Sequence, residues 1–113
     1  MESNEKSKAL LFIKKQTCLQ KLSVNEILYA QSDGNYCNLY TENEKHIINL
    51  SLTKLLQKLS SDYFLRIHKR FLINIEAVEV ISLATNELFI GNKKLPIGRS
   101  YKEQIINRIV VLN

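Results

Sequence analysis

Short apolar stretches rich in β-branched and aromatic side chains recur along the first half of the chain. They lie at residues 10–13, 17–22, 27–31 and 36–40, and runs of this length and composition are typical of β-strands. Polar breaks separate them at residues 14–15, 23–26 and 32–35. The last break reads Ser-Asp-Gly-Asn, in which Asp33-Gly34 or Gly34-Asn35 can adopt the positive φ of a tight hairpin turn. We therefore expect two antiparallel strands here.

The hydrophobic period changes after a further strand predicted at residues 45–49. An i, i+3, i+4, i+7 stripe of leucines follows, which predicts one face of an amphipathic helix, and Ser51 fits its N-cap. The stripe consists of Leu52, Leu55, Leu56 and Leu59. A closing helix is predicted to begin at or just after Ser100, because Ser100 and Glu103 fit the S-x-x-E capping box. Its apolar face would carry Ile105, Ile106, Ile109 and Val110.

Extended segments return between the two predicted helices, at residues 63–67, 77–83, 87–90 and 94–97, with turns at residues 84–86 and 91–92. In strict alternation Arg66, His68 and Arg70 would share a face with Phe64 and Leu72. A strand that buries one side does not combine these residues, so the chain must bend near residues 68–70. The pattern as a whole predicts a mostly β fold with two helices and antiparallel sheets.

The size of the chain suits a single domain. It has 113 residues, 45% of them hydrophobic, which is enough for one core. We assign residues 9–113 to this domain. Residues 1–8 are polar and offer nothing to bury, so we expect a disordered or linker-like arm.

The distribution of charge indicates the kind of partner. Sixteen Lys and Arg against eleven Asp and Glu give a net charge of +5, which favours acidic partners. Residues 65–75 and 88–102 contain cations and no acid, and apolar residues at their ends can anchor them to a core. Two anchored cationic segments favour a polyanion, above all nucleic acid. The bland alternative is a solvated loop in which Arg66 pairs with an acid such as Glu76 or Glu79.

Catalysis finds little support in the residue pattern. His46 and His68 are the only histidines, and no nucleophile motif, glycine-rich phosphate loop or cluster of carboxylates accompanies them. Cys18 and Cys37 lack the spacing of a zinc site and are interpreted as buried reduced thiols. We expect no enzymatic activity, no cofactor and no metal. No apolar run is long enough to cross a membrane and the first residues lack a secretory pattern, so we expect a cytoplasmic protein with no membrane partner.

Four blocks occur in an order and spacing that resemble the LytTR family of bacterial DNA-binding domains. The blocks are Ile27-Leu-Tyr-Ala with Asn35-Tyr, Leu50-Ser-Leu with Leu55, Phe64-Leu-Arg-Ile-His-Lys-Arg-Phe-Leu-Ile-Asn74, and Leu95-Pro-Ile-Gly-Arg-Ser-Tyr101. The resemblance covers nearly the whole chain, from about residue 9 to residue 109. The most distinctive block is the Arg-x-His-Lys/Arg core that ends at Asn74.

The resemblance implies an elongated arrangement of small sheets whose loops, rather than a recognition helix, enter successive major grooves. It further implies sequence-specific binding of double-stranded DNA in transcriptional regulation, at paired direct repeats in promoters that are bent on binding. Family members usually form the effector part of two-component response regulators. An upstream receiver domain, absent from this chain, is therefore a further expected partner if the chain is an excised effector piece, and the alternative is a single-domain regulator.

The resemblance also implies which residues contact DNA. Carried over position by position, they are Asp33, Gly34, Asn35, His68, Lys69, Arg70 and Arg99. Two positions depart from the usual pattern, because Arg70 replaces a small serine and Gly98 replaces the serine before the late arginine. For His68 a hydrogen-bonded turn histidine is an equal alternative. Asn74 and Pro96 are interpreted as architectural, the amide satisfying buried backbone groups and the proline fixing the approach to Arg99.

Two other function classes compete with this hypothesis, an RNA-binding small-β module and a protein-interaction domain. RNA binders of this size usually expose aromatic side chains on a sheet for base stacking. Here the aromatic residues fall mostly at core-periodic positions, namely Tyr29, Tyr36, Tyr40, Phe64, Phe71 and Phe89.

Overall fold

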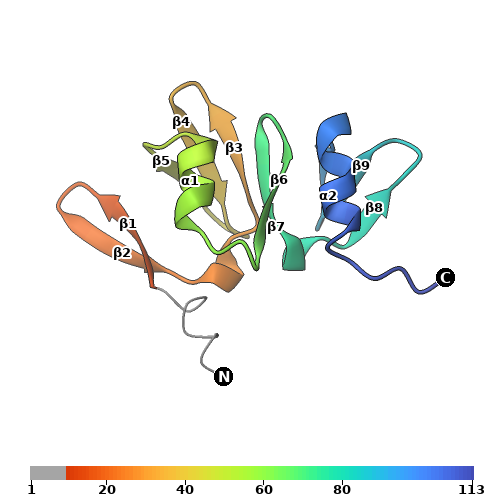
Figure 1. Cartoon of the computed structure of the whole chain (residues 1–113). Helices are drawn as coiled ribbons and strands as arrows, with labels where there is room; N and C mark the ends of the chain where they lie inside the picture. Colours follow the sequence, from red (N-terminus) through yellow and green to blue (C-terminus); the bar gives the residue numbers. More distant parts are fainter. Residues whose placement is uncertain (1–9) are drawn as a thin grey trace.

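A computed structural model describes residues 10–113, and the arm predicted at residues 1–8 lies outside the described residues. Within residues 10–113 the chain forms three antiparallel sheets and two short α-helices (Figure 1). The first sheet is a hairpin of β1 (Leu11–Lys15) and β2 (Cys18–Leu22). The molecule measures 49 × 39 × 24 Å along its principal axes, which fits the elongated, mostly β fold that was predicted.

The central sheet has five strands in the order β5-β4-β3-β7-β6. They are β3 (Tyr29–Asp33), β4 (Tyr36–Tyr40), β5 (Lys45–Ile48), β6 (Phe64–His68) and β7 (Phe71–Asn74). The third sheet has the order β10-β9-β8, from β8 (Val80–Ser82), β9 (Glu87–Ile90) and β10 (Lys93–Pro96). The helices are α1 (Leu52–Lys58) and α2 (Lys102–Ile106), and 3₁₀ turns occur at η2 (Val24–Glu26), η3 (Ile75–Ala77) and η4 (Arg99–Tyr101).

The central sheet is buried on both faces, and each face has its own apolar cluster. Neighbouring residues of one strand go to opposite clusters: Ala30 and Leu72 join the first, whereas Tyr29 and Ile73 join the second. The first cluster is completed by α1 and the β1–β2 hairpin, the second by the third sheet and α2. Each fully buried Leu or Ile side chain stabilises the fold by about 1.5–3 kcal/mol, so the sheet is held rigidly from both sides.

The first predicted helix is confirmed and the second is partly wrong. Ser51 caps α1 as expected, its hydroxyl accepting a hydrogen bond from the Lys54 amide at 3.2 Å. Ser100 makes no cap bond, because residues 99–101 wind into a 3₁₀ turn closed by the Tyr101 amide and the Gly98 carbonyl at 2.9 Å. The helix ends at Ile106, and Val110, predicted on its apolar face, is 85% exposed.

The strand boundaries show where the sequence pattern was insufficient. The predicted break at residues 14–15 is the end of β1, and the turn lies one step later, with Gln16 at a φ of 56°. Residues 77–79, predicted as strand, lie in η3 and the segment before β8. The hairpin turn at Gly34 is confirmed, since its φ is 64° and Asp33 pairs with Tyr36. The predicted bend is also confirmed by an irregular register between Arg66 and His68.

Two expectations about burial are corrected. Cys18 is exposed, because it lies next to the turn of the projecting β1–β2 hairpin. Cys37 is buried, and this burial raises the pKa of its thiol. Tyr36 is 50% exposed at the β3–β4 turn instead of joining a core. Tyr29, by contrast, is buried and stacks on Tyr40 with ring centroids 4.6 Å apart. No helix in the described part of the chain is long and apolar enough to span a membrane.

Candidate nucleic-acid interface

Three connections lie together at one edge of the molecule. The β3–β4 and β6–β7 turns are at the top of Figure 1, and the segment that leads from β10 into η4 is hydrogen-bonded to β6 beside the second of them. Two long-range backbone hydrogen bonds hold them together. The Ser32 amide donates to the Arg70 carbonyl at 3.0 Å, and the Gly98 amide donates to the Ile67 carbonyl at 2.7 Å. We call residues 33–35, 68–70 and 99 the turn edge. The structure therefore brings together all seven sequence-predicted contact residues.

The side chains of the turn edge are mostly free to meet a partner. Lys69, Arg70 and Arg99 are exposed, and so are Asp33, Gly34 and Asn35. The one carboxylate among the seven, Asp33, accepts a hydrogen bond from the Asn38 amide at 3.4 Å. The turn edge thus combines three permanent cations with one oriented acid and one free amide.

His68 is half-buried and fits the alternative of a hydrogen-bonded turn histidine. Its Nδ1 accepts from the Arg70 amide at 3.1 Å, and its ring meets Phe71 edge-on with centroids 5.8 Å apart. Because Nδ1 is an acceptor, the neutral ring carries its proton on Nε2. That nitrogen is a hydrogen-bond donor of the kind that a phosphate oxygen accepts.

Arg66 does not form the ion pair with Glu76 or Glu79 that was considered as an alternative from the sequence. Its Nε donates to the His68 carbonyl at 3.0 Å, its Nη2 to the Lys69 carbonyl, and its Nη1 to the Thr53 hydroxyl of α1 at 3.3 Å. The Arg66 guanidinium thus holds the β6–β7 turn through its hydrogen bonds to the His68 and Lys69 carbonyls.

Gly98 connects the segment that carries the late arginine to β6 through its backbone amide, which donates to the Ile67 carbonyl at 2.7 Å. A Cβ at this position would lie 3.0 Å from Cδ2 of Tyr101, a tight contact with that ring, whereas its distance of 3.6 Å from Cα of His68 is an ordinary van der Waals distance. Arg99 follows as the first residue of η4. The Gly98–Ile67 backbone hydrogen bond, and not a capped helix beginning near Ser100, therefore fixes the position of Arg99.

The second cationic segment of the sequence is divided by the fold. Lys93 and Lys94 lie at the far end of β10, away from Gly98. Lys94 lies 3.9 Å from Glu87, and Lys93 lines a pocket rich in acids. The absence of acids from this segment therefore did not predict which of its cations lie together in the fold. Arg99 is the cation that the segment contributes to the turn edge.

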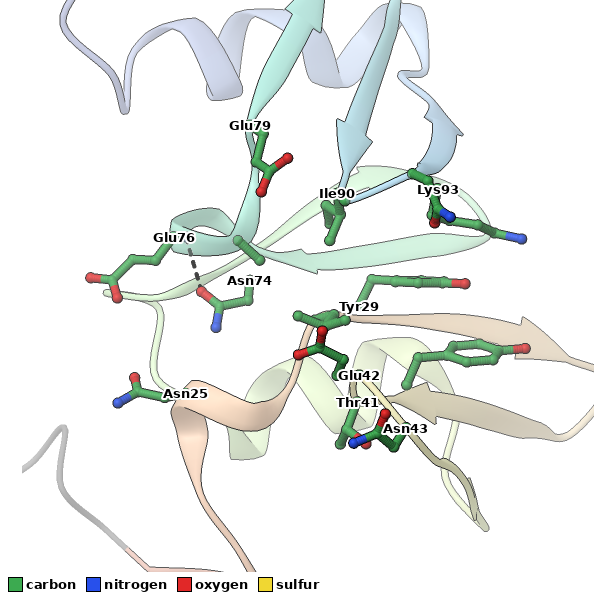
Figure 2. Close-up of a pocket in the computed structure, with 15 residues that line it drawn as sticks. Asn25, Tyr29, Thr41, Glu42, Asn43, Asn74, Glu76, Glu79, Ile90 and Lys93 are labelled. Carbon is green, nitrogen blue, oxygen red and sulfur yellow. Dashed lines mark hydrogen bonds between the residues drawn. The ribbon is translucent and has the colours of Figure 1, made fainter.

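The other ends of β3, β4 and β7 form an open pocket of about 790 Å³. Glu42, Glu76 and Glu79 line it, together with the stacked Tyr29 and Tyr40 (Figure 2). Burial, and next the charge of Tyr40, raise the pKa of Tyr29. Three carboxylates make this end unfavourable for a polyanion, so the pocket does not extend the candidate interface.

Asn74 lies at the border of this pocket and is 3% exposed. Its amide nitrogen donates to the Ile27 carbonyl at 2.9 Å and the Val24 carbonyl at 3.4 Å, and its oxygen accepts from the Glu76 amide at 3.0 Å. The architectural interpretation of Asn74 is confirmed, because every contact goes to backbone groups.

Sequence reasoning missed two features. The first is the role of Arg66, which no sequence signal indicates because its main partners are backbone carbonyls. The second is a further acid-free segment, residues 6–25, whose described part projects as the β1–β2 hairpin with Lys14, Lys15 and Lys21 exposed (Figure 1). The charge criterion applied to residues 65–75 would have found it. Within residues 10–113 no group of His, Cys, Asp and Glu is arranged to hold a metal ion.

A small, mostly β domain that presents cations on turns has the features expected of a nucleic-acid-binding module. Residues 17–109 match the LytTr DNA-binding domain, and the chain belongs to this family.

The similar proteins support the same family and fold. RcoM 1 of Paraburkholderia xenovorans, a heme-containing CO-sensing transcriptional regulator, is 28% identical over 74% of this chain and 33% of its own length. The transcriptional regulatory protein YpdB of Escherichia coli is 27% identical over 68% of this chain and 34% of its own length. A solved LytTr domain of a putative response regulator from Bacillus cereus matches with a TM-score of 0.75 at 18% identity, covering 89% of this chain and 96% of that one. The chain spans about a third of the length of these curated relatives.

Proposed function

We propose that the turn edge binds double-stranded DNA in a sequence-specific manner and that this binding regulates transcription. The observation that carries the proposal is the joining of three connections by the Ser32–Arg70 and Gly98–Ile67 backbone hydrogen bonds, which assembles Lys69, Arg70 and Arg99 on one exposed edge. A preassembled edge loses little conformational entropy when it binds. The transcriptional regulators among the relatives support the same conclusion.

Each group has a role that follows from its chemistry. Lys69 and Arg70 are assigned to phosphates, where they supply affinity without sequence information. Arg99 is assigned to a guanine edge, because a guanidinium can donate to O6 and N7 together. Asp33 suits a cytosine amino group and Asn35 an adenine edge, with Gly34 letting the backbone approach closely. His68 is assigned to a phosphate through its Nε2 proton.

The wider context is proposed by analogy with the relatives. Residues 9–113 would act as the effector part of a two-component response regulator in the cytoplasm, with residues 1–8 as an arm or linker and a receiver domain as the partner that controls it. The domain would bind paired direct repeats in promoters and bend them. No catalytic step is part of this proposal.

Selection of bound duplexes from a random DNA pool tests the proposal. We expect an enriched sequence, bound more tightly than a random duplex at the same salt concentration, and an affinity that falls steeply as salt rises, because each neutralised phosphate contributes about −0.9 to the log–log slope. Single-stranded RNA at matched salt is the comparison for the alternative class. Tighter binding to RNA would favour an RNA-binding module, and no salt-dependent binding to either would favour a protein-interaction domain.

A further inference from the structure

The β6–β7 turn uses every one of its four successive carbonyl oxygens, at residues 67–70, within the protein. The Ile67 oxygen accepts from the Gly98 amide and the Arg70 oxygen from the Ser32 amide. The His68 and Lys69 oxygens both accept from the Arg66 guanidinium. The two outer carbonyls are therefore held by neighbouring segments, and the two inner ones by a single side chain.

This arrangement matters for a polyanion because a free carbonyl oxygen repels a phosphate. Arg66 takes up both inner carbonyls from the protein side, while the side chains of Lys69 and Arg70 are exposed. The third contact of Arg66, with the Thr53 hydroxyl at 3.3 Å, connects the turn to α1. The shape of the turn is thus coupled to a helix whose Leu52 and Leu55 belong to the first core cluster.

The charge of Arg66 also remains available to the surface. Among residues 10–113 no carboxylate lies within salt-bridge distance of this guanidinium, since the contacts at that distance join His46 with Glu44 and Lys94 with Glu87. Arg66 is half-buried, where solvent screens its charge less than at the exposed cations. It therefore adds positive potential beneath the two residues that are assigned to phosphates.

We infer that Arg66 is the positioning residue of the DNA interface, which fixes the β6–β7 turn in the one conformation that presents Lys69 and Arg70 together. This inference rests on the proposed DNA-binding function. The planar guanidinium, with several donors in a fixed geometry, is what two carbonyls and a hydroxyl require. Lysine keeps the charge but offers one flexible ammonium, so Arg66→Lys separates geometry from charge.

The experiment compares Arg66→Lys and Arg66→Ala with the wild type on the selected duplex and on a random duplex, as a function of salt. The matched control is Arg108→Lys, because Arg108 also places a guanidinium on two carbonyls, those of Ser61 and Asp62 at 2.8 and 3.1 Å, outside the turn edge. Backbone amide spectra of each free protein report the conformation of residues 67–71. Thermal unfolding confirms that each variant is folded.

We expect Arg66→Lys to weaken binding to both the selected and the random duplex by about tenfold, which corresponds to about 1.4 kcal/mol, and to make the salt dependence shallower, because Lys69 and Arg70 lose phosphate contacts on any sequence. The amide signals of residues 68–70 should shift or broaden. Arg108→Lys should leave affinity and these signals unchanged. If Arg66→Ala does not fold, the binding and spectra of the folded Arg66→Lys variant decide the test.

Two results would overturn the inference. Wild-type affinity in Arg66→Lys would show that the geometry of the guanidinium is unimportant. A salt slope that becomes shallower by about 0.9 in Arg66→Ala and is restored in Arg66→Lys would make Arg66 a direct phosphate contact. A wild type that prefers no duplex refutes the proposed function itself, which is a different outcome from a wild type that binds specifically and a lysine variant that binds equally well.

Discussion

Strands β3, β4 and β7 each run between two chemically opposite ends of the domain. At one end, the turn edge presents Lys69, Arg70 and Arg99, and the backbone is satisfied by Arg66 and by neighbouring amides. At the other end, the same strands reach a pocket lined by Glu42, Glu76 and Glu79, and the backbone is satisfied by the buried Asn74. A net charge of +5 conceals this division.

The comparison teaches that one rigid sheet can orient the domain as well as support it. Strands of four or five residues separate the two ends by about 15 Å, at a rise of about 3.3 Å per residue. A polyanion is attracted by one end and repelled by the other, so approach in the wrong orientation is unfavourable from the first encounter. The same kind of substitution should therefore affect DNA binding at the turn edge but not at the pocket end.

The largest effect is expected at Arg99. Arg99→Ala should weaken binding to the selected duplex far more than to a random duplex, because a bidentate contact discriminates by about 1–3 kcal/mol per base. Arg99→Lys should restore charge but little discrimination. Affinities of both variants on both duplexes at one salt concentration provide the measurement. Equal losses on the two duplexes, with near-complete rescue by lysine, would reduce Arg99 to a phosphate contact.

At the pocket end the expected effect is on stability. Asn74→Ala leaves buried backbone groups without partners and should lower the free energy of unfolding by about 1–3 kcal/mol, with a lower thermal midpoint. The folded protein should bind DNA as the wild type does. Asn43→Ala, an exposed amide that lines the same pocket, serves as the control and should change neither property. A variant of Asn74 with normal stability but lost DNA binding would assign this residue to the interface.

Lys69 and Lys93 provide a smaller but cleaner contrast, because both are exposed lysines at opposite ends of the domain. Lys69→Ala should reduce the steepness of the log–log salt dependence by roughly one, since one phosphate contact is lost. Lys93→Ala removes the same charge beside the acidic pocket and should leave the slope unchanged. Titrations at several salt concentrations measure both. Equal slopes for the two variants would mean that net charge, not position, governs affinity.

The smallest effect is expected for Glu76→Gln. Removing this exposed carboxylate should tighten binding slightly at low salt and have no measurable effect at 0.15 M, where charges further apart than about 8 Å are screened. Titrations of random duplex at the two ionic strengths check this. A strong effect at the higher salt concentration would contradict the separation of the two ends.

Local patterns predicted the elements that local interactions determine. β9 lies at the predicted residues 87–90, and α1 begins after the predicted Ser51. The closing helix was predicted less well because an S-x-x-E sequence does not always form a capping box. This sequence occurs twice in the chain, at Ser23 and at Ser100, with different results. At Ser23 the amide does donate to the Glu26 carboxylate at 3.0 Å, whereas at Ser100 the approach of Gly98 to the β6–β7 turn leads the chain into a 3₁₀ turn instead.

The members of the candidate interface could be named from the sequence, but their assembly could not. The bonds that join them connect residue 32 with residue 70 and residue 67 with residue 98, separations that no periodicity within a short window can report. The role of Arg66 depends on carbonyl oxygens, which every residue carries and no residue type signals. The resemblance to a family supplied the positions, and the fold supplied the contacts that relate them.

The full use of the carbonyl oxygens at residues 67–70 has a consequence for retargeting this domain. A loop whose backbone is anchored at every residue does not tolerate a change of length, because one inserted residue would misalign the amides of Ser32 and Gly98 at once. New binding preferences should therefore arise by exchange of side chains on a constant backbone. A combinatorial library that varies the base-assigned positions 33, 35 and 99 without insertions should yield folded variants with altered operators, whereas length variation is better directed to the β8–β9 turn.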